Sequence, residues 1–381
     1  MLQALFQSWD ICNRPVLVRA DLNVPICNNT ITSDFKLKAF EPTLQALIKQ
    51  EAFIIIATHM STEANSGALL STQLLIPWFI RNGYPVSYVP DLPSARPDSN
   101  KRIILLENLR SFPGEQEGSV EFARALAQLS SYYINDAFGV LHRSDASVVA
   151  APALFDVNRR SRGLLVDKEL RILTPIKVAP KHPYLCMVGG GKPATKLPLI
   201  FDFLSLVDTM VILPGLSNTY GAALQQPIGN SSIDTQLKAA CLKTVYNAQH
   251  TLILPIDYQV ASKAISGTTR MSDVSDVRRD DIIVSIGPKT IALLQAPITH
   301  AHTIVLNGLP GFAAFEHTQL ATKALLTSVT QSTAYTILCG SDSIASAEKY
   351  HFLSQFTYVS TGGGATLAYL AGKTLPGLQY I

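Results

Sequence analysis

Basic side chains, with one carboxylate and one amide, follow four apolar runs in the first half of the chain, at residues 16–18, 52–57, 102–106 and 132–135. Because the carboxyl ends of parallel strands meet at one sheet edge, we expect these side chains to converge on one concave site. Guanidinium and imidazole groups gathered in this way bind phosphate or carboxylate, although each taken singly is more often a surface ion pair or a structural side chain. The residues are Arg19, Asp21, Asn23, His59, Arg110, His142 and Arg143.

Three glycine-rich turns follow apolar runs in the second half of the chain. They begin at Gly189, Gly340 and Gly362, and helical sequence follows each one. Turns without Cβ atoms let backbone N–H groups approach phosphate oxygens, and the next helix offers its positive end. Each turn alone is more often a tight connection, and none matches a Walker A or GxGxxG fingerprint. Together they predict a polyphosphate site of an unusual kind.

Short apolar runs, which must position these residues, alternate along the chain with segments whose apolar residues recur at helical spacing. This alternation is typical of βαβ units, so we predict an α/β fold with parallel sheets. Eleven runs are too many for one open sheet, and a chain of 381 residues favours two domains. A polar stretch within residues 157–169 is the predicted hinge between them. The predicted strands are 16–18, 52–57, 102–106, 132–135, 184–188, 209–213, 251–255, 281–286, 303–306, 335–339 and 356–359.

Composition narrows the class of protein. Hydrophobic residues make up 47% and charged residues 15%, which excludes intrinsic disorder. A net charge of +3 does not favour nucleic acid as a partner, and no apolar run approaches the length of a membrane span. The 5 cysteines are scattered without a CxxC pair, as expected of reduced, buried thiols in a cytoplasmic protein. No secretory signal is recognisable in residues 1–10.

Eight segments in order resemble phosphoglycerate kinases over essentially the whole chain. Residues 16–25 resemble that family's Arg-x-Asp-x-Asn-Val-Pro segment, and residues 135–143 its Asn-Asp-Ala-Phe-Gly-x-x-His-Arg segment. The remaining segments are 189–196, 286–288, 307–308, 340–343, 360–365 and 372–377. The resemblance implies two similar-sized Rossmann-like domains with parallel sheets and a hinge between them. Residues 1–160, with a returning tail at 360–381, would bind phosphoglycerate, and residues 161–359 would bind the nucleotide.

The implied reaction is reversible phosphoryl transfer between 1,3-bisphosphoglycerate and ADP, giving 3-phosphoglycerate and ATP with Mg²⁺, in a cytoplasmic monomer without nucleic-acid or membrane partners. The implied glycerate ligands are Arg19, Asp21, Asn23, Lys36, His59, Thr62, Arg110, His142 and Arg143. The implied nucleotide ligands are Gly190, Gly191, Lys192, Lys196, Gly215, Asn307, Glu316, Gly340, Ser341, Asp342 and Ser343, with Asp342 on the metal. The implied catalytic residues are Lys36, Lys192, Gly340 and Gly363.

Departures from the family pattern fall on these sites. Lys36 and Thr62 stand where the family has arginines, and Thr195 where it has aspartate. The segment 213–215 replaces a glycine run beside the adenine. Ala314 stands at the ribose-binding glutamate, although Glu316 could serve if the loop shifts by two residues.

Three readings therefore stay open: a working and slower phosphoglycerate kinase, a catalytically weak relative kept for nucleotide or protein binding, and a kinase for another small carboxylate.

Overall fold

A six-stranded parallel sheet forms the first half of the chain, in the order β5-β6-β4-β1-β7-β8. The structure is a computed structural model and describes residues 4–61, 69–191, 193–248 and 251–381. The strands are β1 (Pro15–Ala20), β4 (Phe53–Ala57), β5 (Val86–Val89), β6 (Ile103–Leu106), β7 (Tyr132–Asp136) and β8 (Arg160–Arg162). A small hairpin, β2 (Ile26–Cys27) with β3 (Thr30–Ile31), follows β1.

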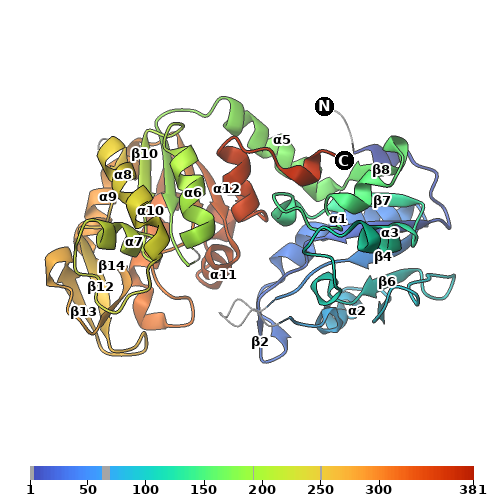
Figure 1. Cartoon of the computed structure of the whole chain (residues 1–381), viewed down its shortest axis with the longest axis horizontal. Coiled ribbons are helices and arrows are strands. Elements are labelled where there is room, and N and C mark those ends of the chain that lie inside the picture. Colours follow the sequence, from blue (N-terminus) through green and yellow to red (C-terminus); the bar gives the residue numbers. More distant parts are fainter. Residues whose placement is uncertain (1–3, 62–68, 192, 249–250) are drawn as a thin grey trace. The chain divides into compact units, whose positions relative to one another are not determined.

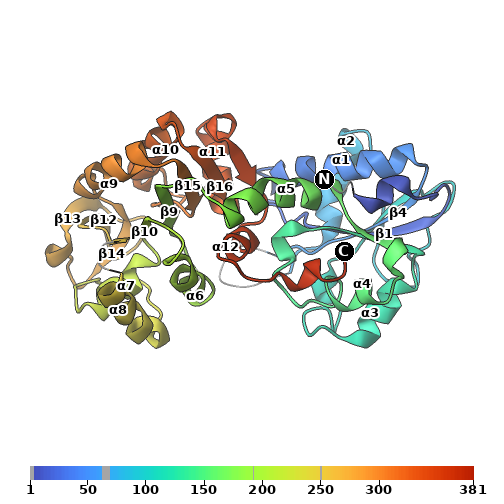
Figure 2. The ribbon, with the colours of Figure 1, turned by 90° about the horizontal axis from the view of Figure 1, so that it is seen from above.

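Alternation along the strands gives this sheet two buried faces. Val16 and Val18 of β1 pack into one core with α1 (Phe35–Lys49) and α2 (Ile76–Arg81), whereas Leu17 packs into the other with α3 (Val120–Ala127) and α4 (Ala150–Ala153). Successive side chains of a strand point to opposite faces, so a wholly apolar strand needs helices on both sides. Figure 2 shows α1 and α2 on one side of β1 and β4, and α3 and α4 on the other.

The expected linker between domains is instead part of the first sheet. Residues 160–162 form β8, which pairs in parallel with β7, and α5 (Leu164–Val178) follows directly. β8 is an edge strand, and the backbone N–H of Phe6 donates to Oγ of its buried Ser161. The chain divides into two compact units, one comprising Met1–Thr174 with Lys373–Ile381 and the other Pro175–Gly372, so the boundary in the sequence falls within α5. In the first unit, the backbone N–H of Gly377 donates to the carbonyl of Leu141.

The second unit, coloured from green to red in Figure 1, carries its own six-stranded parallel sheet. Its strand order is β11-β10-β9-β15-β16-β17. Helices α9, α10 and α11 lie on one side and α6, α7 and α8 on the other, as Figure 2 shows. The strands are β9 (Tyr184–Val188), β10 (Thr209–Ile212), β11 (Leu252–Ile253), β15 (Thr303–Asn307), β16 (Tyr335–Cys339) and β17 (Tyr358–Ser360). The helices are α6 (Pro193–Phe203), α7 (Ser217–Ala223), α8 (Lys238–Asn247), α9 (Pro288–His300), α10 (Leu320–Gln331), α11 (Ser341–Lys349) and α12 (Gly364–Leu370).

One predicted parallel strand lies in an antiparallel sheet. Residues 281–286 form β14, which pairs with β12 (Asp257–Ser262), and β12 pairs with β13 (Thr269–Asp273). The apolar run of β14 resembled the parallel strands, and its polar partners gave no strand signal. The fold class predicted from the sequence is nevertheless confirmed: an α/β chain with two parallel sheets.

The described helices are all too short or too polar to cross a lipid bilayer. None of the 5 cysteines, all of which lie in the described ranges, forms a disulfide, and Cys186, Cys241 and Cys339 are buried. The expectation that every cysteine is a buried apolar residue was therefore wrong for Cys12 and Cys27, which are exposed.

Candidate functional site

The first predicted site begins where β1 ends, with a buried ion pair. Lys36 in the first turn of α1 places its Nζ atom 2.8 Å from Oδ2 of Asp21. Burial alone would raise the pKa of Asp21, but the charge of Lys36, its hydrogen bond to Asp21 and the charge of Arg19 outweigh burial and lower the pKa to about 2. Asn23 lies nearby, and its Oδ1 accepts the backbone N–H of Ser61 at 3.1 Å. Lys36 is thus engaged with Asp21 rather than free.

Arg19 is buried beneath the ion pair of Lys36 and Asp21 and is not exposed to solvent. Its side chain is fully buried, and the register of β1 places it beside Ala57 and Asn135. Its Nη2 atom lies 3.3 Å from Nδ1 of His59, and its Nη1 donates to the carbonyl of Ala20 at 2.6 Å. The sequence predicted a direct ligand at this position, whereas the structure places Arg19 behind His59.

Two residues that sequence reasoning missed hold Arg19 from the other side. Nε of Arg19 donates to Oγ of Ser147 at 2.8 Å, and that hydroxyl donates to Oε1 of Glu115 at 2.5 Å. The backbone N–H of Ser147 also donates to Oε2 of Glu115 at 2.9 Å. Burial raises the pKa of Glu115, while the charge of Arg19 opposes the rise. Nothing in the spacing of Glu115 or Ser147 along the chain marks either residue.

Arg110 and Arg143 supply the remaining charges of this site. The Nε atom of Arg110 is buried and has no hydrogen-bond partner in the described parts of the chain. Burial lowers the pKa of Arg110, and the charge of Arg143 lowers it further. Asp145 is buried as well, and its Oδ2 likewise has no partner among described residues. Buried polar atoms normally have partners, so an unpaired guanidinium nitrogen beside a second cation is suited to binding an anion.

His142 is exposed, and its pKa is lowered by desolvation and then by Arg143. We refer to Asp21, Asn23, Lys36, His59, Arg110 and Arg143 together as the basic site. Thr62, predicted as a further ligand, lies outside the described residues.

The second predicted site is built from close backbone contacts. Gly308 has φ +91°, and a Cβ atom there would lie 2.2 Å from the carbonyl oxygen of Gly189. Gly215 has φ +89°, and its Cβ would lie 2.3 Å from the carbonyl oxygen of Gly190. Only glycine adopts such backbone angles freely and leaves this space. The turns after β9, β10 and β15 therefore pack directly on one another, and we call this cluster the glycine site.

The segment that replaces the family's glycine run packs against this cluster. Leu213 and Pro214 are buried, and the carbonyl of Pro214 accepts the backbone N–H of Gly190 at 2.9 Å. On the other side of that turn, Nζ of Lys196 donates to the carbonyl of Gly189 at 2.7 Å. Gly191 has open space where a side chain would be. Lys192, predicted to follow the transferred group, falls outside the residues that the structure describes.

The turns after β16 and β17 join the glycine site through Asn307. Its Nδ2 atom lies 3.2 Å from Sγ of Cys339 and 3.4 Å from the carbonyl oxygen of Gly363. Its Oδ1 atom is buried with no partner among the described residues. Gly340 precedes α11 with φ +98°, and Oγ of Ser343 accepts the backbone N–H of Gly308 at 2.8 Å. Sequence and structure therefore agree that these turns converge.

The first turn of α11 carries the predicted metal ligand. The side chains of Ser341 and Asp342 make no hydrogen bond or ion pair with the described residues, and no side chain caps this helix. Asp342 is exposed. No group of three or more His, Cys, Asp or Glu residues is placed to hold a metal within the described ranges. A single free carboxylate fits Mg²⁺ only if phosphate oxygens and water complete the coordination, which is the arrangement this ion prefers.

The carboxylate of Glu316, the predicted alternative ribose ligand, is engaged by three side chains of its own unit. Its Oε1 lies 2.7 Å from Nζ of Lys323, and its Oε2 lies 2.7 Å from Nζ of Lys349 and 2.9 Å from the hydroxyl of Tyr350. The hydrogen bonds from these three side chains, led by Lys323, lower the pKa of Glu316 to about 2. Ala314, its alternative, is exposed, as is Thr195.

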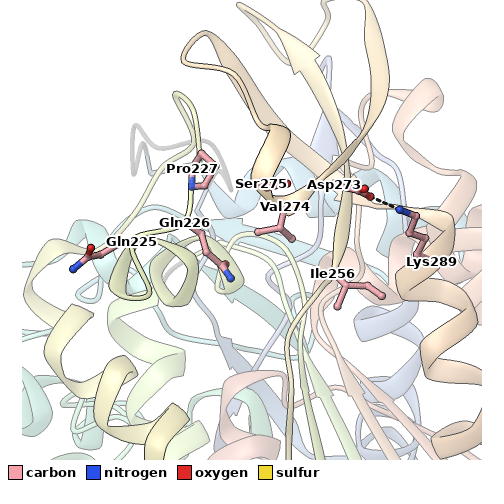
Figure 3. Close-up of a pocket in the computed structure, with 8 residues that line it drawn as sticks. All are labelled: Gln225, Gln226, Pro227, Ile256, Asp273, Val274, Ser275 and Lys289. Atoms are coloured by element: carbon pink, nitrogen blue, oxygen red, sulfur yellow. Dashed lines mark hydrogen bonds and ion pairs between the residues drawn. The ribbon is translucent and has the colours of Figure 1, made fainter.

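A surface cavity of about 600 Å³ lies elsewhere in the second unit, shown in Figure 3. Its wall includes Lys289, whose Nζ lies 2.6 Å from Oδ1 of Asp273. The backbone N–H groups of Lys289 and Thr290 are capped by the carboxylate of Asp257 at 2.9 and 2.7 Å. The ammonium group of Lys289 and the first N–H groups of α9 thus already have carboxylate partners within the chain. No predicted site residue lines this cavity, and it offers no unpaired charge.

Known proteins match the chain along its length. The phosphoglycerate kinase family model matches residues 6–373. A phosphoglycerate kinase of Bdellovibrio bacteriovorus is 34% identical over 393 aligned positions, covering 98% of this chain and 96% of the relative. One of Pelotomaculum thermopropionicum is 32% identical over 392 positions, covering 100% and 99%. The solved phosphoglycerate kinase of Coxiella burnetii has a TM-score of 0.75 at 30% identity, and that of Pyrococcus horikoshii has 0.84 at 25%; each comparison covers 98% of this chain and 97% of the other.

Proposed function

The chain belongs to the phosphoglycerate kinase family and is a phosphotransferase, and we propose that it transfers a phosphoryl group reversibly between 1,3-bisphosphoglycerate and ADP, giving 3-phosphoglycerate and ATP. This reaction serves glycolysis and gluconeogenesis, here in a cytoplasmic monomer. The single observation that carries the proposal is the buried, unpaired Nε atom of Arg110 beside the charge of Arg143.

In the proposed glycerate complex, Arg110 and Arg143 bind the phosphate or carboxylate as charge-assisted donors. Asp21 accepts a hydrogen bond from the glycerate hydroxyl, and Nδ2 of Asn23 donates to the oxygen of that hydroxyl. Lys36, 2.8 Å from Asp21, keeps the carboxylate ionised. His59 donates to an anionic oxygen, with Arg19 acting through it. His142 and Thr62 complete the proposed set.

The glycine site would take the nucleotide. Backbone N–H groups at Gly190, Gly191, Gly340 and Gly363 bind phosphate oxygens because no Cβ obstructs them. Asn307, with its buried unpaired Oδ1, offers an acceptor to the ligand. The other proposed nucleotide contacts are Lys192, Lys196, Gly215, Ser341 and Ser343. Glu316 is a proposed ribose ligand on the sequence resemblance alone.

Asp342 would hold Mg²⁺ together with nucleotide phosphate oxygens and water. When bound, the ion neutralises charge on the phosphates.

No general base is required by this chemistry. The carboxylate of 3-phosphoglycerate is already ionised near pH 7, so its oxygen attacks the γ-phosphorus of ATP directly and ADP departs with the bond electrons. Catalysis then reduces to alignment and to neutralising charge, which suits a chain that supplies cations and backbone donors. Lys192 and Lys36 are the proposed catalytic cations.

Water near an acyl phosphate would hydrolyse it, so the proposal includes closure about a hinge near α5 once both ligands are bound. Small-angle scattering should show compaction with 3-phosphoglycerate and MgADP together. A radius unchanged by both ligands would contradict the closure.

A coupled assay with 3-phosphoglycerate and MgATP tests the function itself, with turnover expected. Binding of MgATP by calorimetry without turnover on 3-phosphoglycerate would overturn the proposal and favour a nucleotide-binding relative. Turnover on another small carboxylate alone would favour a changed acceptor.

A further inference from the structure

The ring of His59 has one nitrogen turned toward a group that can only donate. Nδ1 of His59 lies 3.3 Å from Nη2 of Arg19. A guanidinium has no acceptor atom, so a hydrogen bond between them requires a bare Nδ1 lone pair. The hydrogen of a neutral ring must then be on Nε2. That atom makes no hydrogen bond within the described residues, which leaves its N–H available to a ligand.

The surroundings keep this ring neutral. Burial lowers the pKa of His59 well below 6.5, and the charge of Arg19 adds to this effect. The other cations that face the ring, Arg110 and Lys36, act in the same direction, and only Asp21 opposes them. Burial and three cations thus outweigh one carboxylate, and the ring stays neutral at pH 7.

Arg19 can orient the ring because its own position is fixed. Nη1 is held by the carbonyl of Ala20 at 2.6 Å, and Nε by Oγ of Ser147 at 2.8 Å. The hydroxyl of Ser147 donates its hydrogen to Oε1 of Glu115, with 2.5 Å between the two oxygens. The lone pairs of the hydroxyl oxygen can therefore accept from Arg19. All three side chains behind His59 are at least 98% buried. A buried carboxylate also balances the buried guanidinium charge.

We propose that Glu115 and Ser147 are positioning residues of the basic site: through Arg19 they hold His59 as the tautomer with hydrogen on Nε2, which donates to an anionic oxygen of the ligand. The identity of that anion rests on the proposed function. The tautomer does not, because it is a property of the chain without any ligand.

The test is ¹⁵N NMR of the full chain labelled at histidine, with the His59 signals identified by their loss in His59→Gln. The expected spectrum has a protonated Nε2 and a bare Nδ1 from pH 8 down to pH 6. In Ser147→Ala the second tautomer should appear, because Arg19 loses the acceptor that fixes it. A hydrogen on Nδ1 in the native chain, or a ring that Ser147→Ala leaves unchanged, would overturn the proposal.

Two further variants separate positioning from packing. Ser147→Thr keeps a hydroxyl and should keep the native tautomer, whereas Glu115→Gln should disturb it by removing the balancing charge. Thr72→Val is the matched control, since it removes another buried hydroxyl of the same unit, one that donates to the carbonyl of Leu106 and lies outside the basic site. Equal disturbance by Thr72→Val and Ser147→Ala would contradict the proposal.

Kinetics give a second readout if the chain is active. Losing an oriented donor to a charged oxygen should raise KM for 3-phosphoglycerate about tenfold in Ser147→Ala. The KM for MgATP should not change. An unchanged KM for 3-phosphoglycerate would count against His59 as the positioned donor, whereas absence of all turnover in the native chain would count against the proposed function and leave the tautomer result standing.

Discussion

The basic site and the glycine site are built by different means. In the basic site, polar side chains are held by charged ones: Lys36 pairs with Asp21, and the buried Arg19 beneath the site contacts the neutral ring of His59. In the glycine site, backbone segments touch where side chains are absent, as at Gly308 against Gly189. A change of charge in the first can leave the fold in place, whereas an added methyl group in the second must move the backbone. The two sites should therefore fail in different ways.

The largest effect is expected from Gly308→Ala. Its φ of +91° is strained for alanine, and the new Cβ would lie 2.2 Å from the carbonyl oxygen of Gly189. The free energy of unfolding in urea should fall by about 3 kcal/mol, and calorimetry should show MgADP binding lost. Gly83→Ala is the control, because Gly83 has φ +83° with nothing within 4 Å of the added atom. It should cost about 1 kcal/mol. An equal loss of unfolding free energy in Gly308→Ala and Gly83→Ala would contradict the claim that the contact with Gly189 requires glycine.

Lys36→Met should expose the dependence of the basic site on charge pairs. It leaves Asp21 buried without its partner, so unfolding at pH 7 should become easier by about 3 kcal/mol. The pKa of Asp21 is about 2 in the folded chain and 3.8 in the reference state, so its ionised form stabilises the fold above about pH 4. This contribution is lost as pH falls toward 2. The gap between native chain and variant should therefore narrow in acid, and a constant gap would contradict the ion pair.

A second buried carboxylate of the first unit should behave in the opposite sense. Asp136 caps the start of α5 through the N–H groups of Leu165 and Val166, and burial raises its pKa to about 6. Its stabilising contribution is complete below about pH 4 and is lost as pH rises through 6. Asp136→Asn removes this titration, so its stability relative to the native chain should improve by about 3 kcal/mol from pH 4 to 7. Urea unfolding across that range provides the measurement, and parallel pH curves would refute it.

The smallest effect is expected from Glu316→Gln. Both carboxylate oxygens are already engaged by Lys323, Lys349 and Tyr350 at the surface. Calorimetry should show MgADP affinity changed by less than about threefold, since exposed ion pairs contribute little. A much larger loss would restore Glu316 as a nucleotide ligand and extend the glycine site to this loop.

The sequence was informative where the signal is local. Apolar runs located most strands of both parallel sheets, whereas β12 and β13 were missed because neither carries a continuous apolar run. Glycine turns indicated the second site. Position 308 must be glycine, however, because its backbone contacts Gly189, in the turn after a different strand. Arg19 was predicted as a site residue, but its burial was not predicted. Ser147 was missed because its contact with Arg19 joins residues 128 positions apart in the sequence. Contacts between distant segments decide these roles, and periodicity does not report them.

The central claim is that the basic site binds the phosphoglycerate and the glycine site binds the nucleotide. Calorimetry with 3-phosphoglycerate and with MgADP on Arg110→Ala and Gly308→Ala tests it directly. Arg110→Ala should lose 3-phosphoglycerate binding roughly a hundredfold and keep MgADP binding, and Gly308→Ala should do the reverse. If Arg110→Ala weakened both ligands equally, or left 3-phosphoglycerate binding intact, the claim would be contradicted.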